Sequence, residues 1–289
     1  MNGKYWDRPL SWVDGCTPCS PGCEHCWSAG MTHRFQGGLT FWPTKAHPYP
    51  RFCGKIITHP ERLSIPLKRR KPTVFAVWND LFHEAVPTQF IDDALEVMAA
   101  CPRHTFLILT KRAHLMEEKI YGVTEEHGCR ELGGGDYLPN VWHGLTVCNQ
   151  QEWNEKGPIF MQVPGLKFIS HEPALERIDY HLSGSIKDVA WRRTHGGSYE
   201  RSFIAGLIAG GETGSGARPS HPDIFRIDRD QCAAGGVPFF FKGWGAYGVN
   251  YLIDDDMSMI PGSEWMDKGV KPSGRLLDGR EHNELPWRE

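Results

Sequence analysis

Short runs of consecutive apolar residues, rich in β-branched and aromatic side chains, recur along the chain. Strands that are buried on both faces of a parallel sheet have such continuous runs, whereas half-exposed strands alternate apolar and polar positions. The pattern predicts eight strands, of which the first two are the weakest. They span residues 11–13, 55–58, 73–78, 105–110, 141–147, 167–170, 203–209 and 238–242.

Amphipathic segments between these runs predict helices. Residues 88–100 repeat apolar positions at helical spacing, and Thr88 is placed to cap this helix. Residues 112–119 predict a shorter helix, and residues 221–234 predict another that ends at a pair of glycines. Strands that alternate with helices are typical of βαβ units and a parallel sheet.

The number of strands decides between two forms of the fold. Eight strands with their helices form a closed (β/α) barrel of TIM type, whereas loss of the two weak strands leaves a partial barrel. We therefore expect an α/β fold with a TIM-type barrel, full or partial, in a single domain of residues 1–289. The polar tail at residues 248–289 is expected to pack over one end of the barrel.

Composition and charge narrow the class of protein. The chain has 289 residues, of which 40% are hydrophobic and 23% are charged, as in globular proteins. No apolar run resembles a secretory signal or a membrane helix, so we expect a cytoplasmic protein without a membrane partner. The net charge of -3 gives no overall basic field, so a nucleic-acid partner must be held by local patches.

Four of the nine cysteines lie in one short loop. Because the count is odd and no export signal is found, the clustered thiols indicate metal or redox chemistry and not a disulfide framework. Cys19, Cys23 and Cys26 have C-x3-C-x2-C spacing, while Cys16, Cys23 and Cys26 have C-x6-C-x2-C spacing. Either set can hold three irons of a [4Fe-4S] cluster and leave the fourth iron open for S-adenosylmethionine (SAM).

Two other interpretations of the four cysteines stay open at this point. All four thiolates can close a cluster fully, which leaves no iron for SAM. Alternatively, the pairs Cys16 with Cys19 and Cys23 with Cys26 can bind structural zinc. Only three residues separate these pairs, whereas zinc ribbons have roughly 15–20 residues between theirs, so the spacing favours iron–sulfur.

Seven ordered motifs carry a resemblance to a known family. They are DGCTPCSPGCEHCW, NDLFHEAVP, FLILTKR, LPNVWHGLTV, FISHEPAL, LIAGGETGSGARP and CAAGGVPFFFKGWG. The chain resembles a phage-associated, radical-SAM-like family with a three-cysteine motif, long regarded as a domain of unknown function. The family's usual C-x6-C-x2-C spacing implies Cys16, Cys23 and Cys26 as cluster ligands. Cys19 is then an addition, or the alternative first ligand.

The resemblance implies a radical SAM enzyme, in which the cluster and SAM generate a 5'-deoxyadenosyl radical. Some phages hypermodify thymine in their own DNA, so the implied substrate is a nucleobase in phage DNA, for example an aminoacylated thymine that is isomerised. The implied partners are DNA or a nucleotide, and an external electron donor. The basic run at residues 68–71 is the candidate contact with a nucleic-acid backbone, and a solvated loop is its alternative.

Two functions of other kinds also fit the sequence. One is a non-catalytic nucleic-acid-binding protein that is stabilised by zinc or a cluster. The other is a radical SAM enzyme that acts on a peptide or a small metabolite. DNA binding that depends on residues 68–71 would favour a nucleobase substrate over this last alternative.

Polar residues follow the predicted strands, and the carboxyl ends of barrel strands meet on the face that carries the active site. The candidate cofactor-binding residues are Asp80, His83, Lys111, Gly210, Gly211 and Glu212. Asp80 and His83 are candidates for the SAM ribose or the substrate. Lys111 suits the SAM carboxylate or a phosphate, and Glu212 suits the SAM amino group, although the glycine-rich loop around Glu212 can equally bind a substrate phosphate. The alternatives are helix capping, a surface salt bridge and a tight turn, respectively.

Two further strand-end residues are candidates for catalysis. Glu172 follows a buried strand, where a carboxylate can hold an amine or relay a proton. Lys242 lies in the apolar run PFFFKGWG, and a buried lysine needs a partner. We therefore expect both side chains to face the substrate.

Overall fold

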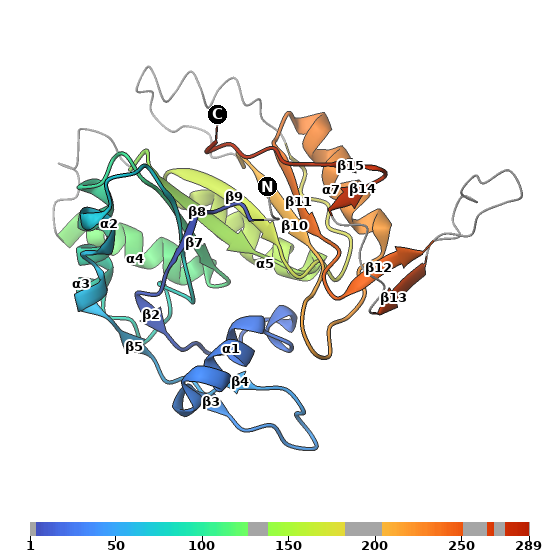
Figure 1. Cartoon of the computed structure of the whole chain (residues 1–289). Coiled ribbons are helices and arrows are strands. Elements are labelled where there is room, and N and C mark those ends of the chain that lie inside the picture. Colours follow the sequence, from blue (N-terminus) through green and yellow to red (C-terminus); the bar gives the residue numbers. More distant parts are fainter. Residues whose placement is uncertain (1–3, 127–137, 183–203, 251–264, 269–274, 289) are drawn as a thin grey trace, which may run out of the picture.

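The computed structural model describes residues 4–126, 138–182, 204–250, 265–268 and 275–288. At its centre, seven parallel strands form one curled sheet in the order β1-β6-β7-β8-β9-β10-β11 (Figure 1). They are β1 (Arg8–Leu10), β6 (Val74–Val77), β7 (Thr105–Thr110), β8 (Val141–Thr146), β9 (Leu166–His171), β10 (Leu207–Gly210) and β11 (Phe239–Gly243). Every residue of β6, β8, β9 and β10 is buried, which confirms what the continuous apolar runs indicated.

Four helices in the described residues connect successive strands of the sheet. They are α3 (Thr88–Ala99), α4 (Ala113–Glu126), α5 (Gln150–Gln162) and α7 (Pro222–Gly235). Three of them confirm the predicted helices, although α4 runs on well beyond residue 119. Thr88 is not the N-cap, because Pro87 occupies that position and Thr88 is the first helical residue.

Helix α5 has no counterpart among the predicted helices. It contains Gly157 and Pro158, residue types that normally interrupt a helix. The helix still begins at a strong cap, because the Asn149 side chain accepts a hydrogen bond from the backbone N–H of Glu152 at 2.8 Å. Packing of its buried residues, among them Phe160, against the sheet outweighs the poor local propensity.

The expectation of a TIM-type barrel is wrong. Strands β1 and β11 are the two edges of the sheet, which curls into an open half-barrel. The two weak segments stay outside it, since β2 (Val13–Asp14) and β5 (Ile57–Thr58) pair antiparallel with each other. Only two residues separate β1 from β2, whereas a parallel neighbour requires a crossover of about a dozen residues. The chain therefore leaves the sheet after β1, and only the α/β class is confirmed.

The concave face of the sheet, opposite the helices, has two layers of different character. Near the amino ends of the strands, large apolar side chains fill it: Val74, Leu107, Trp142, Phe168, Ile208 and Phe240. Nearer the carboxyl ends, the side chains are mostly small or polar: Ala76, Thr146, Ser170, Gly210 and Lys242. Alternate residues of a strand point to the same face, so these sets form successive layers. The second layer leaves open space at the carboxyl ends of the strands.

Between β1 and β6 the chain forms two features, here called the cysteine loop (residues 15–26) and the arm (residues 27–55). The arm lies below the sheet in Figure 1 and contains α1 and the paired strands β3 and β4. Its elements and their neighbours are a 3-10 helix (Pro21–Cys23), α1 (Trp27–Phe35), a 3-10 helix (Gly37–Leu39), β3 (Thr40–Phe41), β4 (Arg51–Phe52), a 3-10 helix (Pro60–Arg62) and α2 (Ile65–Lys68).

The C-terminal part contributes short strand pairs and a segment whose apolar side chains pack against the concave face of the sheet. The strands are β12 (Tyr247–Asn250), β13 (Trp265–Lys268), β14 (Leu276–Leu277) and β15 (Arg280–Glu281). Leu285 and Trp287 pack into the apolar layer of the concave face, and Trp287 Nε1 donates to the carbonyl of Tyr5 at 3.0 Å. Among the helices that the structure describes, none combines the length and the apolar character needed to cross a bilayer.

Two ionisable side chains, His143 and Lys167, are buried beside each other in β8 and β9. Burial, together with the charge of Lys167, lowers the pKa of His143 to about 3. An imidazole in an unfolded chain has a pKa near ~6.5. Between these values the unfolded state binds a proton that the folded state does not bind, so stability decreases as the pH falls through this window.

Lowering the pH from 7 to 5 is therefore expected to decrease the free energy of unfolding by about 2 kcal/mol through His143 alone. The variant His143→Leu should lose this part of the acid sensitivity, because leucine does not titrate. Urea unfolding at both pH values, followed by tryptophan fluorescence, measures the difference. Equal acid sensitivity in the variant would contradict the assignment.

Candidate functional site

A cavity of about 690 Å³ lies at the carboxyl ends of the strands. The cysteine loop forms one wall with Cys16, Cys19, Cys23 and Cys26. The strand ends contribute Asp80, Lys111, Glu172, Gly210, Gly211, Glu212 and Lys242. The structure thus brings together the candidate residues from all parts of the sequence, and of these only His83 lies outside the lining.

The backbone fixes the path of the cysteine loop. Gly15 has a φ of +93°, and a Cβ atom there would lie 2.0 Å from the carbonyl oxygen of Lys55, so glycine is required where the chain turns into the loop. At the other end Cys26 is the N-cap of α1. The eight cysteines in the described residues are free, and in the loop Cys19 is exposed while the other three are half-buried.

The four thiols of the loop differ in acidity. The thiol of Cys19 hydrogen-bonds to Cys23 and lowers the pKa of Cys23 to about 5. The same hydrogen bond, followed by burial, raises the pKa of Cys19. Burial raises the pKa of Cys16 to about 12 and also raises the pKa of Cys26. The hydrogen bond therefore favours the thiolate form of Cys23 over that of Cys19, and burial disfavours the thiolate forms of Cys16 and Cys26.

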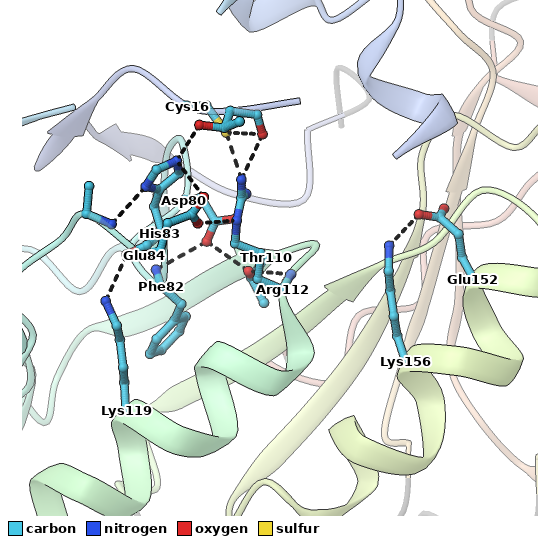
Figure 2. A network of polar contacts seen from close by, with 12 residues as sticks. Cys16, Asp80, Phe82, His83, Glu84, Thr110, Arg112, Lys119, Glu152 and Lys156 are labelled. Carbon is cyan, nitrogen blue, oxygen red and sulfur yellow. Dashed lines mark hydrogen bonds and ion pairs between the residues drawn. The ribbon is translucent and has the colours of Figure 1, made fainter. Parts of the chain in front are cut away.

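Arg112 joins the cysteine loop to the sheet, and Figure 2 shows its guanidinium between Cys16 and Asp80. Nη1 donates to Asp80 Oδ2 at 2.8 Å and to the sulfur of Cys16 at 3.8 Å, and Nη2 donates to the carbonyl of Thr17 at 2.8 Å. The hydroxyl of Thr110 donates to the other oxygen of Asp80 at 2.8 Å. Asp80 is thus engaged within the protein and positions Arg112 against the loop.

His83 lies behind this network. Its Nδ1 accepts from the backbone N–H of Ala85 at 3.1 Å, so Nε2 carries the proton and donates to the hydroxyl of Thr17 at 2.8 Å (Figure 2). Burial, and then the charge of Arg112, lower the pKa of His83 and keep the ring neutral. His83 supports the cysteine loop from outside the cavity.

Glu212 is held by Arg218 and His25. Arg218 donates from Nε and Nη2 to the two carboxylate oxygens at 2.9 and 2.7 Å, and His25 Nδ1 lies 3.2 Å from Oε2. Burial opposes ionisation, but the hydrogen bonds from Arg218 lower the pKa of Glu212. Arg218 also donates to the carbonyl of Pro21 at 2.9 Å. The carboxylate that the sequence assigned to the SAM amino group therefore ties the strand end to the cysteine loop.

The two glycines before Glu212 serve close packing of the backbone. A Cβ atom on Gly211 would lie 2.1 Å from the carbonyl oxygen of Trp244, and its N–H donates to the carbonyl of Gly243 at 3.0 Å. A Cβ atom on Gly210 would lie 3.2 Å from the carboxylate of Glu172. The lack of a side chain at these two positions therefore lets the ends of β10 and β11 lie close together.

Glu172 and Lys242 form an ion pair on the cavity wall, with 2.8 Å between Nζ and Oε1. The hydroxyls of Tyr5 and Ser170 each donate to Oε2 of Glu172 over 3.2 Å. Burial, and then the charge of Glu172, raise the pKa of Tyr5, so its phenol keeps the proton that it donates. Both residues predicted to be catalytic therefore meet in one cavity.

Lys111 contributes positive charge to the same cavity. Burial opposes this charge, but the negative charge that Cys23 and Cys26 carry as thiolates raises the pKa of Lys111. The three carboxylates of the cavity wall have other cationic partners: Arg112 for Asp80, Lys242 for Glu172 and Arg218 for Glu212. The charge of Lys111 is therefore directed to the thiols and to any anion in the cavity.

Sequence reasoning missed three residues of the site. Arg218 lies six positions after Glu212 in the motif LIAGGETGSGARP, and His25 lies between two loop cysteines, so motif membership was their only signal. Tyr5 precedes the first motif, and nothing in its surroundings marked it. The basic run at residues 68–71 is placed differently from the candidate site, because it precedes β6 and so lies at the amino ends of the strands.

The positions of the cysteines distinguish between a zinc site and a [4Fe-4S] cluster. Among the described residues, no group of three Cys, His, Asp or Glu side chains is arranged to hold a metal ion. A [4Fe-4S] cluster makes a different demand, because each thiolate binds a different iron and the sulfurs stand further apart than around one ion. Three half-buried thiols on one cavity wall, with two cations nearby, are compatible with that donor set.

Of three comparisons with known proteins, only the comparison with protein families gives a match. Neither the comparison with curated proteins nor the comparison with solved structures gives a match to this chain. A protein-family model described as "Protein of unknown function (DUF5131)" matches residues 4–286, which is nearly the whole chain. The chain therefore belongs to the DUF5131 family.

Proposed function

We propose that this protein is a radical SAM enzyme of the phage-associated type, which modifies or rearranges a nucleobase in DNA. The observation that carries the proposal is the meeting of four loop thiols, the half-buried Lys111 and the pair Glu172 and Lys242 around one cavity. When bound, a [4Fe-4S] cluster and SAM supply a hydrogen-abstracting radical. Cys16, Cys23 and Cys26 would hold the cluster.

The residues behind the thiols fit this donor set. Arg112 donates to the sulfur of Cys16, and Lys111 lies next to Cys23 and Cys26. These two cations partly offset the negative charge that several thiolates bring into a half-buried site. Lys111 also suits the carboxylate of SAM, because the carboxylates of the wall already have partners.

Glu172, Lys242 and Tyr5 are proposed to face the substrate. Lys242 holds the charge of Glu172, and the phenol of Tyr5 fixes its second oxygen. An amine on the substrate would find a hydrogen-bond acceptor in Glu172 and, in Tyr5, a group that stays protonated at neutral pH. This suits a substrate with an amino group next to the carbon that reacts, such as an aminoacylated base.

The proposal also includes the cell compartment and the electron donor of the enzyme. Free thiols in the described residues suit a reducing compartment, so we place the protein in the cytoplasm, which is that of the host if a phage encodes it. An external electron donor is needed, because the proposed chemistry begins with a reduced cluster.

Anaerobic reconstitution with iron and sulfide, followed by electron paramagnetic resonance of the reduced protein, tests the proposal. We expect a [4Fe-4S] signal that changes when SAM is added, because an open iron binds SAM directly. A cluster whose signal ignores SAM, or failure to incorporate iron, would overturn the radical SAM assignment. It would instead support a protein that binds nucleic acid without catalysis.

A further inference from the structure

The arm has an unusual charge pattern. From His25 to Pro60 the sequence contains no Asp or Glu and four Lys or Arg, although Asp and Glu make up 35 of the 289 residues of the chain. The whole chain has a net charge of -3, so this stretch is locally positive on a weakly negative molecule. Such a patch attracts polyanions even when the protein as a whole does not.

The arm also exposes large apolar side chains. Trp42, Phe35 and Phe41 are 76%, 68% and 55% exposed, and Trp27 and Met31 are about half exposed. Trp27, Met31 and Phe35 are four residues apart along α1, so they follow one side of the helix. Aromatic side chains gathered on one surface of a globular protein usually mark a binding site.

The aromatic and basic side chains of the arm are interleaved. The guanidinium of Arg34 lies 5.4 Å from the ring of Phe35, and the rings of His33 and Trp42 are 4.7 Å apart. Phe41 pairs with Arg51 across β3 and β4, so these two side chains point to the same face. A surface that alternates rings with cations offers both stacking and charge to a ligand.

We propose that this face of the arm binds an unpaired DNA strand. Unpaired bases stack on exposed aromatic rings, and their phosphates require cations nearby, which is the combination found here. A symmetric contact with the arm of a second copy would bring like charges together, which disfavours that occupant. The choice of DNA over RNA rests on the function proposed above, whereas the stacking surface does not depend on it.

The arm leads into the cavity. Trp27 lies on the cavity wall, and its ring meets the ring of Trp78, also on the wall, at 5.1 Å between centroids. Trp78 directly follows β6 and so belongs to the carboxyl ends of the strands. A strand held on the arm can therefore present one base to the cavity, with Trp27 at the entrance.

Fluorescence anisotropy of the full-length protein with a labelled single-stranded DNA oligonucleotide tests the surface. Loss of one stacked base costs about tenfold in affinity, so we expect Trp42→Ala and Phe35→Ala each to weaken binding by about that factor. Arg51→Gln should lower the slope of affinity against salt by about 0.7, the value for one phosphate contact on a single strand. Trp42→Phe should retain most of the binding, because a ring is kept.

Matched controls come from α2, which precedes β6 and so lies near the amino ends of the strands, away from the cavity. Leu67→Ala removes an exposed apolar side chain outside the arm, 46% exposed, and Lys68→Gln removes a cation of the basic run. Both should bind DNA like the unmodified protein. Equal losses in these controls, unchanged binding in the arm variants, or tighter binding of RNA of the same sequence would each overturn the proposal. The assay needs no cluster, so a protein that binds DNA but ignores SAM would refute only the proposed chemistry.

Discussion

Replacing Cys23 with alanine is expected to abolish cluster binding and SAM cleavage. Cys23 belongs to both possible ligand sets, and the hydrogen bond from Cys19 lowers the pKa of its thiol, which favours the thiolate form that binds iron. Two remaining thiolates leave a second iron of the cluster without a protein ligand. Iron and sulfide content after anaerobic reconstitution, and release of 5'-deoxyadenosine from SAM, should both fall to background.

Comparison with other cysteine variants makes the result specific. Cys19→Ala is expected to keep the cluster, because Cys19 is exposed and Cys16 is the first ligand in the proposed set. Cys53→Ala is the matched control, because Cys53 is a half-buried free thiol outside the loop. If Cys19→Ala has only background activity and Cys16→Ala has full activity, Cys19 is the first cluster ligand and Cys16 is not a ligand. Full activity in Cys23→Ala would remove the cluster from this loop altogether.

Replacing Arg112 with methionine is expected to lower the free energy of unfolding by about 3 kcal/mol or more, because it leaves the charge of Asp80 buried without its partner. The side chains of Arg112 and Asp80 are only 5% and 7% exposed, and the guanidinium also holds the cysteine loop through the carbonyl of Thr17. Urea unfolding of the iron-free protein measures the loss. Cluster uptake should fall as well, since the loop loses this anchor.

Two further variants distinguish the loss of the Arg112–Asp80 ion pair from a nonspecific loss of stability. Arg177→Met breaks the exposed pair of Arg177 and Asp223, and should cost less than about 1 kcal/mol. Adding Asp80→Asn to Arg112→Met removes the unpaired charge and should recover part of the stability. If Arg112→Met costs no more than Arg177→Met, the pair does not anchor the loop as described here.

Much of the sheet was predictable because its signal is local. Residues 105–110 form β7 as predicted, and the runs at 141–147 and 238–242 shift by no more than one residue in β8 and β11. A strand buried on both faces needs continuous apolar residues, and that requirement is written in its own segment. Edge strand β1 (Arg8–Leu10) gave no such signal, because only Leu10 is buried.

By itself, the sequence determined the α/β class, the positions of the buried strands and the clustering of four cysteines in one loop. The tertiary structure decided that the sheet stays open, because β1 and β2 are too close in the chain to lie side by side in a parallel sheet. It also decided what the candidate residues touch, turning Asp80 and Glu212 into anchors of the loop through Arg112 and Arg218. Ion pairs between strand ends and loops follow no periodic spacing along the chain, so only the folded chain can reveal them.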